Sequence, residues 1–247
     1  MKKRILLLSA FAALFGAMLM CCSKDGEAYM PAREVIMANA EIRLGVTIDT
    51  TQSWQTAARK RQEGRGERAV WTYAFEDTPM GDYDMNDVVI KMRESLGDPD
   101  RLEVTLCCVG ASFDLYAYLG ARPLFGGKEL HEAFGQPRGT LINTGLGPEV
   151  EVMVTERIVK PVGFTFSDAD VWIYSPTVHL PMHISKAGDA PCAMAIPGDW
   201  QWPRERVTIT EAYPLFRKFV SGEDKSGRWH GSFYSEKVFA PAAGHAK

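Results

Sequence analysis

Short apolar segments separated by turn residues constrain the fold of this chain more than any other feature. Ala69 to Glu76, Leu102 to Val109 and Val171 to Tyr174 are rich in β-branched and aromatic residues, and Asp, Gly or Pro follows each of them closely. Such segments are too short for helices and recur too often for one hairpin. We therefore predict a mainly β domain, an antiparallel β-sandwich (jelly-roll-like) of about eight strands with one or two peripheral helices.

Two segments have a helical pattern. Apolar residues recur at three- and four-residue spacing from Pro31 to Leu44, and Gly45 is suited to end that helix. A second helix is predicted to begin near Thr210, with Pro214 in its first turn, and to stop at Gly222.

The first 22 residues are typical of a bacterial secretory signal. Lys2, Lys3 and Arg4 precede an apolar run from Ile5 to Met20. That run is shorter than the ~20 residues that a membrane-spanning helix usually needs, and no later segment is longer. We predict a signal peptide over residues 1–22 and no transmembrane domain.

The signal ends at two cysteines in place of a site with small residues. This predicts cleavage before a cysteine that is then lipidated, Cys22 or alternatively Cys21, as in bacterial lipoproteins. The acidic segment from Ser23 to Glu27 resembles the tether that Bacteroidetes use to send lipoproteins to the cell surface. The prediction is a lipid-anchored outer-membrane protein, and ordinary secretion in soluble form is the alternative.

Composition divides the rest of the chain. We predict a tether, short helix and basic mobile loop over residues 23–68, the sandwich over 69–239 and a disordered tail over 240–247. The chain has 28 Lys and Arg residues against 31 Asp and Glu residues, so it has no excess of positive charge for binding nucleic acid.

Three cysteines lie in the predicted sandwich. Cys107 and Cys108 are neighbours on a predicted strand and point to opposite faces, so either one, but only one, could face Cys192 in a disulfide. The alternative is that all three are unpaired and pack as small hydrophobic residues.

The segment from residue 76 to residue 87 concentrates oxygen ligands directly before the apolar strand that begins at Val88. Its carboxylate and amide side chains are Glu76, Asp77, Asp82, Asp84, Asn86 and Asp87. Hard oxygen ligands at this density favour Ca²⁺. The loop is not an EF-hand, because Asp87 replaces its glycine at the sixth position and Arg93 its glutamate at the twelfth. The alternative is a metal-free loop whose side chains cap its own backbone.

No complete catalytic apparatus is visible, so we predict that the protein is not an enzyme. A glycoside hydrolase that uses Glu76 is a remote alternative. His179 and His183 have the spacing of a zinc-binding helix, but Pro181 between them opposes a helix. Three tryptophans could stack on sugars or lie buried in the sandwich. They are Trp200, Trp202 and Trp229.

Several ordered motifs resemble the LruC-domain lipoproteins of Bacteroidetes and spirochaetes. They are Ala74-Phe75-Glu76-Asp77, Gly81-Asp82-Tyr83-Asp84-Met85-Asn86-Asp87-Val88-Val89, Val178-His179-Leu180-Pro181 and the segment from Trp202 to Phe216. The resemblance covers residues 69–239 and implies a β-sandwich in the outer envelope without a settled biochemical activity. We therefore expect the sandwich to bind a glycan or a partner protein, and the alternative is a purely structural envelope protein.

Overall fold

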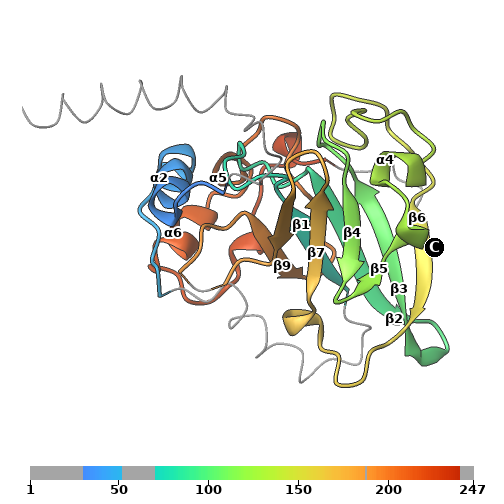
Figure 1. Ribbon diagram of the computed structural model, residues 1–247. Helices are drawn as coiled ribbons and strands as arrows, with labels where there is room; N and C mark the ends of the chain where they lie inside the picture. The colour runs from blue at the N-terminus through green and yellow to red at the C-terminus, as the bar shows by residue number, and fades with distance from the viewer. Residues whose placement is uncertain (1–29, 52–69, 187, 240–247) are drawn as a thin grey trace, which may run out of the picture. The chain divides into compact units, whose positions relative to one another are not determined.

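Two antiparallel sheets with a shared hydrophobic core form the body of the protein (Figure 1). The computed structural model describes residues 30–51, 70–186 and 188–239, and the predicted signal peptide, lipidated cysteine, basic loop and tail lie outside these ranges. From Pro31 on, the described residues belong to one compact unit. The predicted mainly β fold, a β-sandwich with a few short helices, is confirmed.

The larger sheet has five strands in the order β6-β3-β2-β1-β9. Its strands are β1 (Trp71–Phe75), β2 (Val88–Ser95), β3 (Asp98–Cys108), β6 (Val154–Val159) and β9 (Ala193–Pro197). Every residue of β1 is buried, because β1 lies between two other strands and both of its faces are covered. Alternation alone predicts only one buried face for this strand.

The smaller sheet has four strands in the order β5-β4-β7-β8. They are β4 (Tyr116–Leu119), β5 (Arg122–Pro123), β7 (Val171–Ser175) and β8 (Leu180–His183). Burial alternates along β4, β7 and β8, so one face of this sheet joins the core and the other lies outward. Figure 1 shows β4 and β7 in front of the larger sheet.

Helices gather beyond the β9 edge of the larger sheet (Figure 1). α2 (Arg33–Leu44) confirms the first predicted helix, and Gly45 ends it with a left-handed φ of 64°. The second predicted helix is divided into α5 (Ile209–Ala212) and α6 (Phe216–Val220). The break has a simple cause: Tyr213 precedes Pro214 and therefore takes an extended conformation. α4 (Leu130–Ala133) and four short 3₁₀ segments complete the described helices. These segments are η1 (Phe125–Gly127), η2 (Phe166–Asp168), η3 (Trp229–Gly231) and η4 (Ser235–Lys237).

The strand count differs from the prediction of about eight, because the described residues form nine strands. β5, β8 and β9 were not expected, since Pro123, Pro181 and the alanines of β9 weaken the local strand signal. Conversely, the sequence predicts short strands at residues 46–49 and 162–166, and neither segment joins a sheet. The Asp49 N–H instead donates to the carbonyl of Val220 at the end of α6 (2.7 Å).

A cluster of aromatic rings fixes the C-terminal segment. Trp229 packs against Trp200, Tyr213, Phe216 and Phe219 with ring centroids 4.7–6.2 Å apart. These contacts bury area that short helices could not bury alone. Within the described ranges, no helix combines the length and apolar character needed to cross a bilayer.

Candidate cation site

The acidic loop, residues 76–87, connects β1 to β2 at one end of the larger sheet. Glu76 lies at its centre and is fully buried. Its Oε2 accepts a hydrogen bond from the Tyr83 N–H (3.1 Å) and its Oε1 accepts one from the Met85 N–H (2.7 Å). The loop is therefore wrapped around one carboxylate, which satisfies two backbone donors that β pairing leaves free.

Two residues in the left-handed conformation produce this wrapping. Tyr83 has a φ of 63° and Met85 a φ of 57°, and both side chains are fully buried. The conformation costs about 1–2 kcal/mol for each residue. Burial of two large side chains offsets that cost, since each contributes about 1.5–3 kcal/mol. The apolar residues between the acids thus anchor the loop to the core.

Glycines give the acidic side chains their room. A Cβ at Gly81 would overlap Glu76 Oε2 and lie 2.9 Å from the Glu76 carboxyl carbon. A Cβ at Gly110 would overlap Asn86 Oδ1 and lie 2.8 Å from the Asn86 carbonyl oxygen. Neither position accepts a Cβ unless the loop backbone or the neighbouring Glu76 or Asn86 side chain moves.

A distant segment closes the loop. Asp84 Oδ2 accepts a hydrogen bond from the Arg206 N–H (2.8 Å), and the Ile209 N–H donates to the carbonyl of Tyr83 (2.7 Å). Asp84 Oδ1 also accepts from the N–H of Asn86 (3.2 Å), two residues along, as in an Asx-turn. The loop is thus held both by its own residues and by the segment from Arg206 to Ile209.

Three of the six predicted ligands converge. Ligand oxygens of Glu76, Asp82 and Asp84 all lie within 4.8 Å of one another. Two oxygens bound to one Ca²⁺ at ~2.3–2.6 Å are at most about 5 Å apart, so the three fit the first shell of a single ion. Among the described residues this is the one group of three or more acids, histidines or cysteines that meets the spacing.

Two further predicted ligands, Asp77 and Asp87, do not join this group, and Asn86 has contacts of its own. Asp87 Oδ2 accepts a hydrogen bond from the Asp77 N–H (2.7 Å), which places these two residues in a contact of their own. Asn86 is fully buried, and its Nδ2 donates to the carbonyl of Pro203 (3.3 Å). Its Oδ1 is buried and has no hydrogen-bond partner in the described part of the chain.

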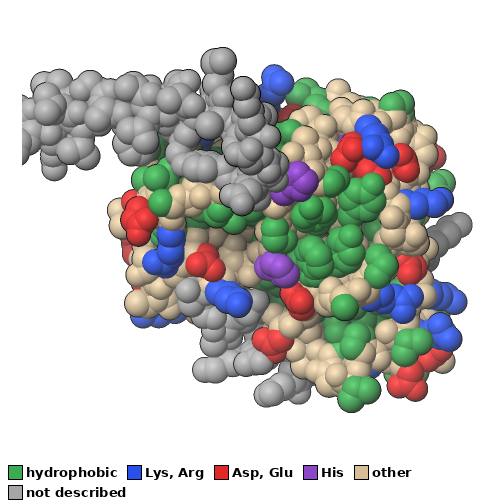
Figure 2. All heavy atoms as spheres, in the orientation of Figure 1, with side chains coloured by type: hydrophobic (Ala, Val, Ile, Leu, Met, Phe, Trp, Pro, Cys, Tyr) green, Lys and Arg blue, Asp and Glu red, His purple; other side chains and the backbone are tan. Residues whose placement is uncertain are grey.

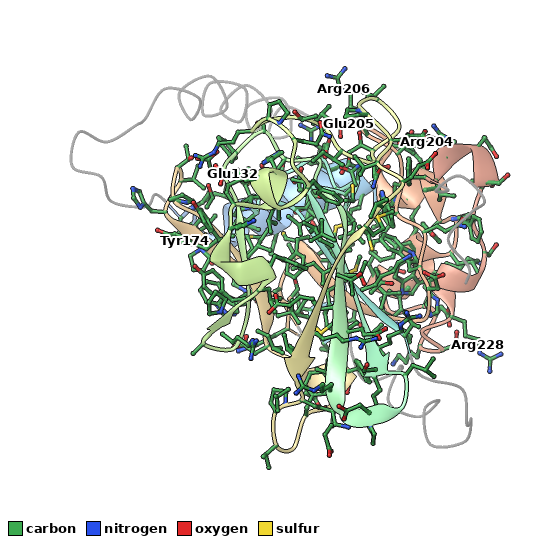
Figure 3. The ribbon with its side chains drawn as sticks, turned by 90° about the vertical axis from the view of Figure 1, so that its right-hand side faces the viewer. Glu132, Tyr174, Arg204, Glu205, Arg206 and Arg228 are labelled. Atoms are coloured by element: carbon green, nitrogen blue, oxygen red, sulfur yellow. The ribbon has the colours of Figure 1, made fainter. Side chains whose placement is uncertain are left out.

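Glu205 is an additional acid near the site that the sequence did not reveal, and it lies outside the converging group of three. Its Oε2 is buried and accepts no hydrogen bond from any residue that the structure describes, and its charge interacts with Asp82 and Asp77. In Figure 3 it lies beside Arg204 and Arg206 at one end of the molecule. It is far from the loop in sequence, and only its position within the quoted motif from Trp202 to Phe216 could have signalled it.

The acids of this site share an unfavourable electrostatic environment. Burial raises the pKa of Glu76 well above its usual range, and the charges of Asp84 and Asp82 raise it further. Burial, followed by the charge of Asp82, raises the pKa of Asp84 to about 8. Burial also raises the pKa values of Asp77, to about 6, and of Glu205. A divalent cation would relieve this repulsion.

The predicted disulfide is absent, because Cys107, Cys108 and Cys192 are free, buried thiols. Cys108 pairs with Val89, which pairs with Ala74, which pairs with Met194 in β9. Three strand spacings of ~4.8 Å therefore separate β3 from the residues around Cys192, about 14 Å in all, and a disulfide needs Cα atoms within ~7 Å.

The other candidate residues lie away from the acidic loop. Trp200, Trp202 and Trp229 are at most 4% exposed, so they belong to the core and do not form a sugar-stacking surface. His179 and His183 are exposed, and His183 lies on a strand, which rules out the zinc helix for these two residues.

Comparison with known proteins extends these observations. A family model described as a domain of unknown function (DUF4842) matches residues 182–230, which is well under half of the chain. The crystal structure of a "putative lipoprotein" from Bacteroides ovatus superposes with a TM-score of 0.50 at 13% identity, over 71% of this chain and 77% of that chain. No curated protein matches the sequence. At this identity the structural likeness shows the fold, and the resemblance to LruC-domain proteins stays a prediction.

Proposed function

We propose that this protein is a lipid-anchored outer-membrane protein whose β-sandwich binds a glycan or a partner protein, with Ca²⁺ ordering the acidic loop. The main support for a bound cation is that Glu76, Asp82 and Asp84 converge, with Glu76 and Asp84 buried. The Bacteroides structure supports the anchor only by analogy of fold and description, together with the predicted lipoprotein signal at Cys22.

The ligand set fits Ca²⁺ chemically. The three converging residues supply carboxylate oxygens, and the orphaned Oε2 of Glu205 lies close enough for its charge to act on the same acids. Ca²⁺ takes 6–8 oxygen ligands in flexible geometry, and water completes the shell where the protein supplies fewer.

The metal-free alternative has support of its own. Glu76 and Asp84 each accept two backbone N–H hydrogen bonds, which is the capping role expected of a purely structural loop. Asp82 distinguishes the two proposals, because no hydrogen bond or ion pair of its side chain occurs among the described residues. The Asp82 carboxylate therefore caps no backbone group among the described residues, and it is available to bind a cation.

Thermal melts test the cation. Addition of Ca²⁺ at 100 times its Kd to EGTA-treated protein stabilises the native state by about 2.7 kcal/mol. At about 2–4 °C per kcal/mol for a domain of this size, we expect the melting temperature to rise by ~5–11 °C. Asp82→Asn should abolish most of this rise without loss of stability in EGTA, since it removes a repelling charge.

A matched control is Glu151→Gln, which removes the same charge at an exposed position. It should leave the calcium response unchanged. An unchanged melting temperature of the parent protein in millimolar Ca²⁺ would exclude the calcium-ordered loop and leave the capped, structural one.

We propose no catalytic role for Glu76. Its side chain is fully buried and both of its oxygens hold the loop backbone, so it has no open path to a glycosidic bond. If the protein were a glycoside hydrolase that uses Glu76, the parent would hydrolyse a member of a glycan panel and Glu76→Gln would remove that activity. We expect no such activity in the parent protein.

The anchor has a separate test in cells. Metabolic labelling with a palmitate analogue should mark the protein, and Cys22→Ser should abolish the label. Label that persists in Cys22→Ser and disappears in Cys21→Ser would assign the anchor to Cys21 instead.

A further inference from the structure

The outward face of the four-stranded sheet carries aromatic rings where a solvated sheet usually carries charged or small polar residues. Its outward positions on β4, β7 and β8 are Tyr116, Tyr118, Trp172, Tyr174, Pro181 and His183. None of them is a carboxylate, a lysine or an arginine. Figure 2 shows hydrophobic side chains gathered over β4 and β7, with histidines at the border of the patch.

The strand register places three of these residues side by side, so that their rings stack. Tyr118 pairs with Trp172 and Trp172 pairs with His183 across neighbouring strands. The Tyr118 and Trp172 rings lie 4.2 Å apart at 12°, and the Trp172 and His183 rings lie 5.1 Å apart at 20°. The stack therefore runs across three strands with its rings nearly parallel.

Hydrogen bonds hold the rings from the sides. Trp172 Nε1 donates to the carbonyl of Gly120 (2.8 Å), and His183 Nδ1 lies 3.1 Å from Asp170 Oδ1. Rings that are already fixed lose little conformational freedom when a ligand binds. The face is thus preorganised, although nothing in the core requires its rings to be aromatic.

The face by itself is too small for a stable protein interface. Three strands spaced ~4.8 Å apart span about 10 Å, and five residues at ~3.3 Å each span about 16 Å, so the face covers about 160 Å². A stable protein–protein interface buries about 800 Å² on each partner. The ligand that fits this face alone is therefore small.

The edges of the sheet exclude strand addition. Pro123 lies on the β5 edge and Pro181 on the β8 edge, and neither residue has an N–H for a further strand. A peptide that extends the sheet would leave its own backbone groups unpaired there. The ligand must lie on the face.

We propose that this aromatic face, the six outward residues of β4, β7 and β8, binds a neutral glycan, an inference that rests on the binding function proposed above. Sugar rings combine apolar C–H surfaces with hydroxyl rims. Tyrosine, tryptophan and histidine offer ring surfaces together with polar tips, and none of the six side chains is a carboxylate, a lysine or an arginine that would require an ionic ligand. Tyr174 also lies apart from Glu205 in Figure 3, so the aromatic face and the acidic loop are different sites.

Affinity electrophoresis tests the inference on the purified protein. Gels would contain xylan, galactomannan, mixed-linkage β-glucan or amylopectin. At least one polysaccharide should retard the parent protein, and Trp172→Ala and Tyr118→Ala should each weaken that retardation by about tenfold. Tyr234→Ala, at an exposed aromatic residue outside the face, is the control and should bind like the parent.

Two further measurements guard against a folding artefact. Tyr116→Ala removes an outward ring for which no side-chain hydrogen bond occurs in the described structure, so it should weaken binding without a change in melting temperature. Trp172 is the one tryptophan among the described residues that is not buried. The bound glycan should therefore protect tryptophan fluorescence from acrylamide quenching in the parent and not in Trp172→Ala.

The outcomes separate the two proposals. Retardation that survives all three aromatic substitutions would overturn the assignment to this face and leave a glycan-binding protein. Absence of retardation in every gel would overturn both this inference and the glycan part of the proposed function, whereas the calcium melts judge the loop independently. Binding to phosphatidylethanolamine and phosphatidylglycerol vesicles that needs Trp172, without retardation by any glycan, would assign the face to the membrane and overturn the inference.

Discussion

Gly81→Ala is the sharpest test of how the acidic loop is built. The new Cβ would overlap Glu76 Oε2 and lie 2.9 Å from the carboxyl carbon, so either the loop backbone or the Glu76 carboxylate must move. Gly81 has no positive φ, and the penalty therefore arises from this contact and not from the backbone conformation of residue 81.

The magnitude follows from what the carboxylate holds. If Glu76 moves, the N–H groups of Tyr83 and Met85 lose their acceptor in a buried setting. A hydrogen bond to a charged group contributes about 1.5–3 kcal/mol. If the loop moves instead, overpacking costs about 1–3 kcal/mol. We expect Gly81→Ala to lower the free energy of unfolding by about 2–4 kcal/mol, and the melting temperature by ~5–15 °C.

Chemical denaturation of four variants completes the experiment. Gly231→Ala is the control, because a Cβ there meets no atom within 4 Å, and its effect should stay within about 0.5 kcal/mol. In a Glu76→Ala background the clash is gone, so adding Gly81→Ala should cost less than about 1 kcal/mol. The reasoning is refuted if Gly81→Ala costs the same with and without Glu76.

The pH dependence and the thiols give two more predictions. In EGTA, the raised pKa values of Asp77, about 6, and Asp84, about 8, mean that the native state binds more protons than the unfolded state above pH 4. Stability should therefore fall as pH rises from 5.5 to 8, and saturating Ca²⁺ should flatten that slope; equal slopes with and without Ca²⁺ would contradict it. Burial raises the pKa of Cys107 to about 11 and of Cys192 to about 12, so all three thiols should react with a thiol reagent only at the rate of unfolding, and dithiothreitol should not shift the melting temperature.

Local chemistry in the sequence determined much of the fold. The spacing of apolar residues located α2 and most strands, and Gly45 marked the helix end. The oxygen-rich segment identified the loop, and Asp87 and Arg93 excluded an EF-hand from the sequence alone. These features depend on residues close together in the chain, which is why their pattern is visible in it.

Contacts between segments that are distant in the sequence determined the remaining features of the fold and of the candidate sites. Which three acids converge depends on the left-handed turns at Tyr83 and Met85, and the recruitment of Glu205 depends on a segment more than a hundred residues away. Likewise, the stack of Tyr118, Trp172 and His183 exists only because three strands align in one register. A sequence pattern shows which residues alternate, but long-range packing sets which strands are neighbours and which faces are covered. That packing buried four of the described tryptophans and left Trp172 partly exposed.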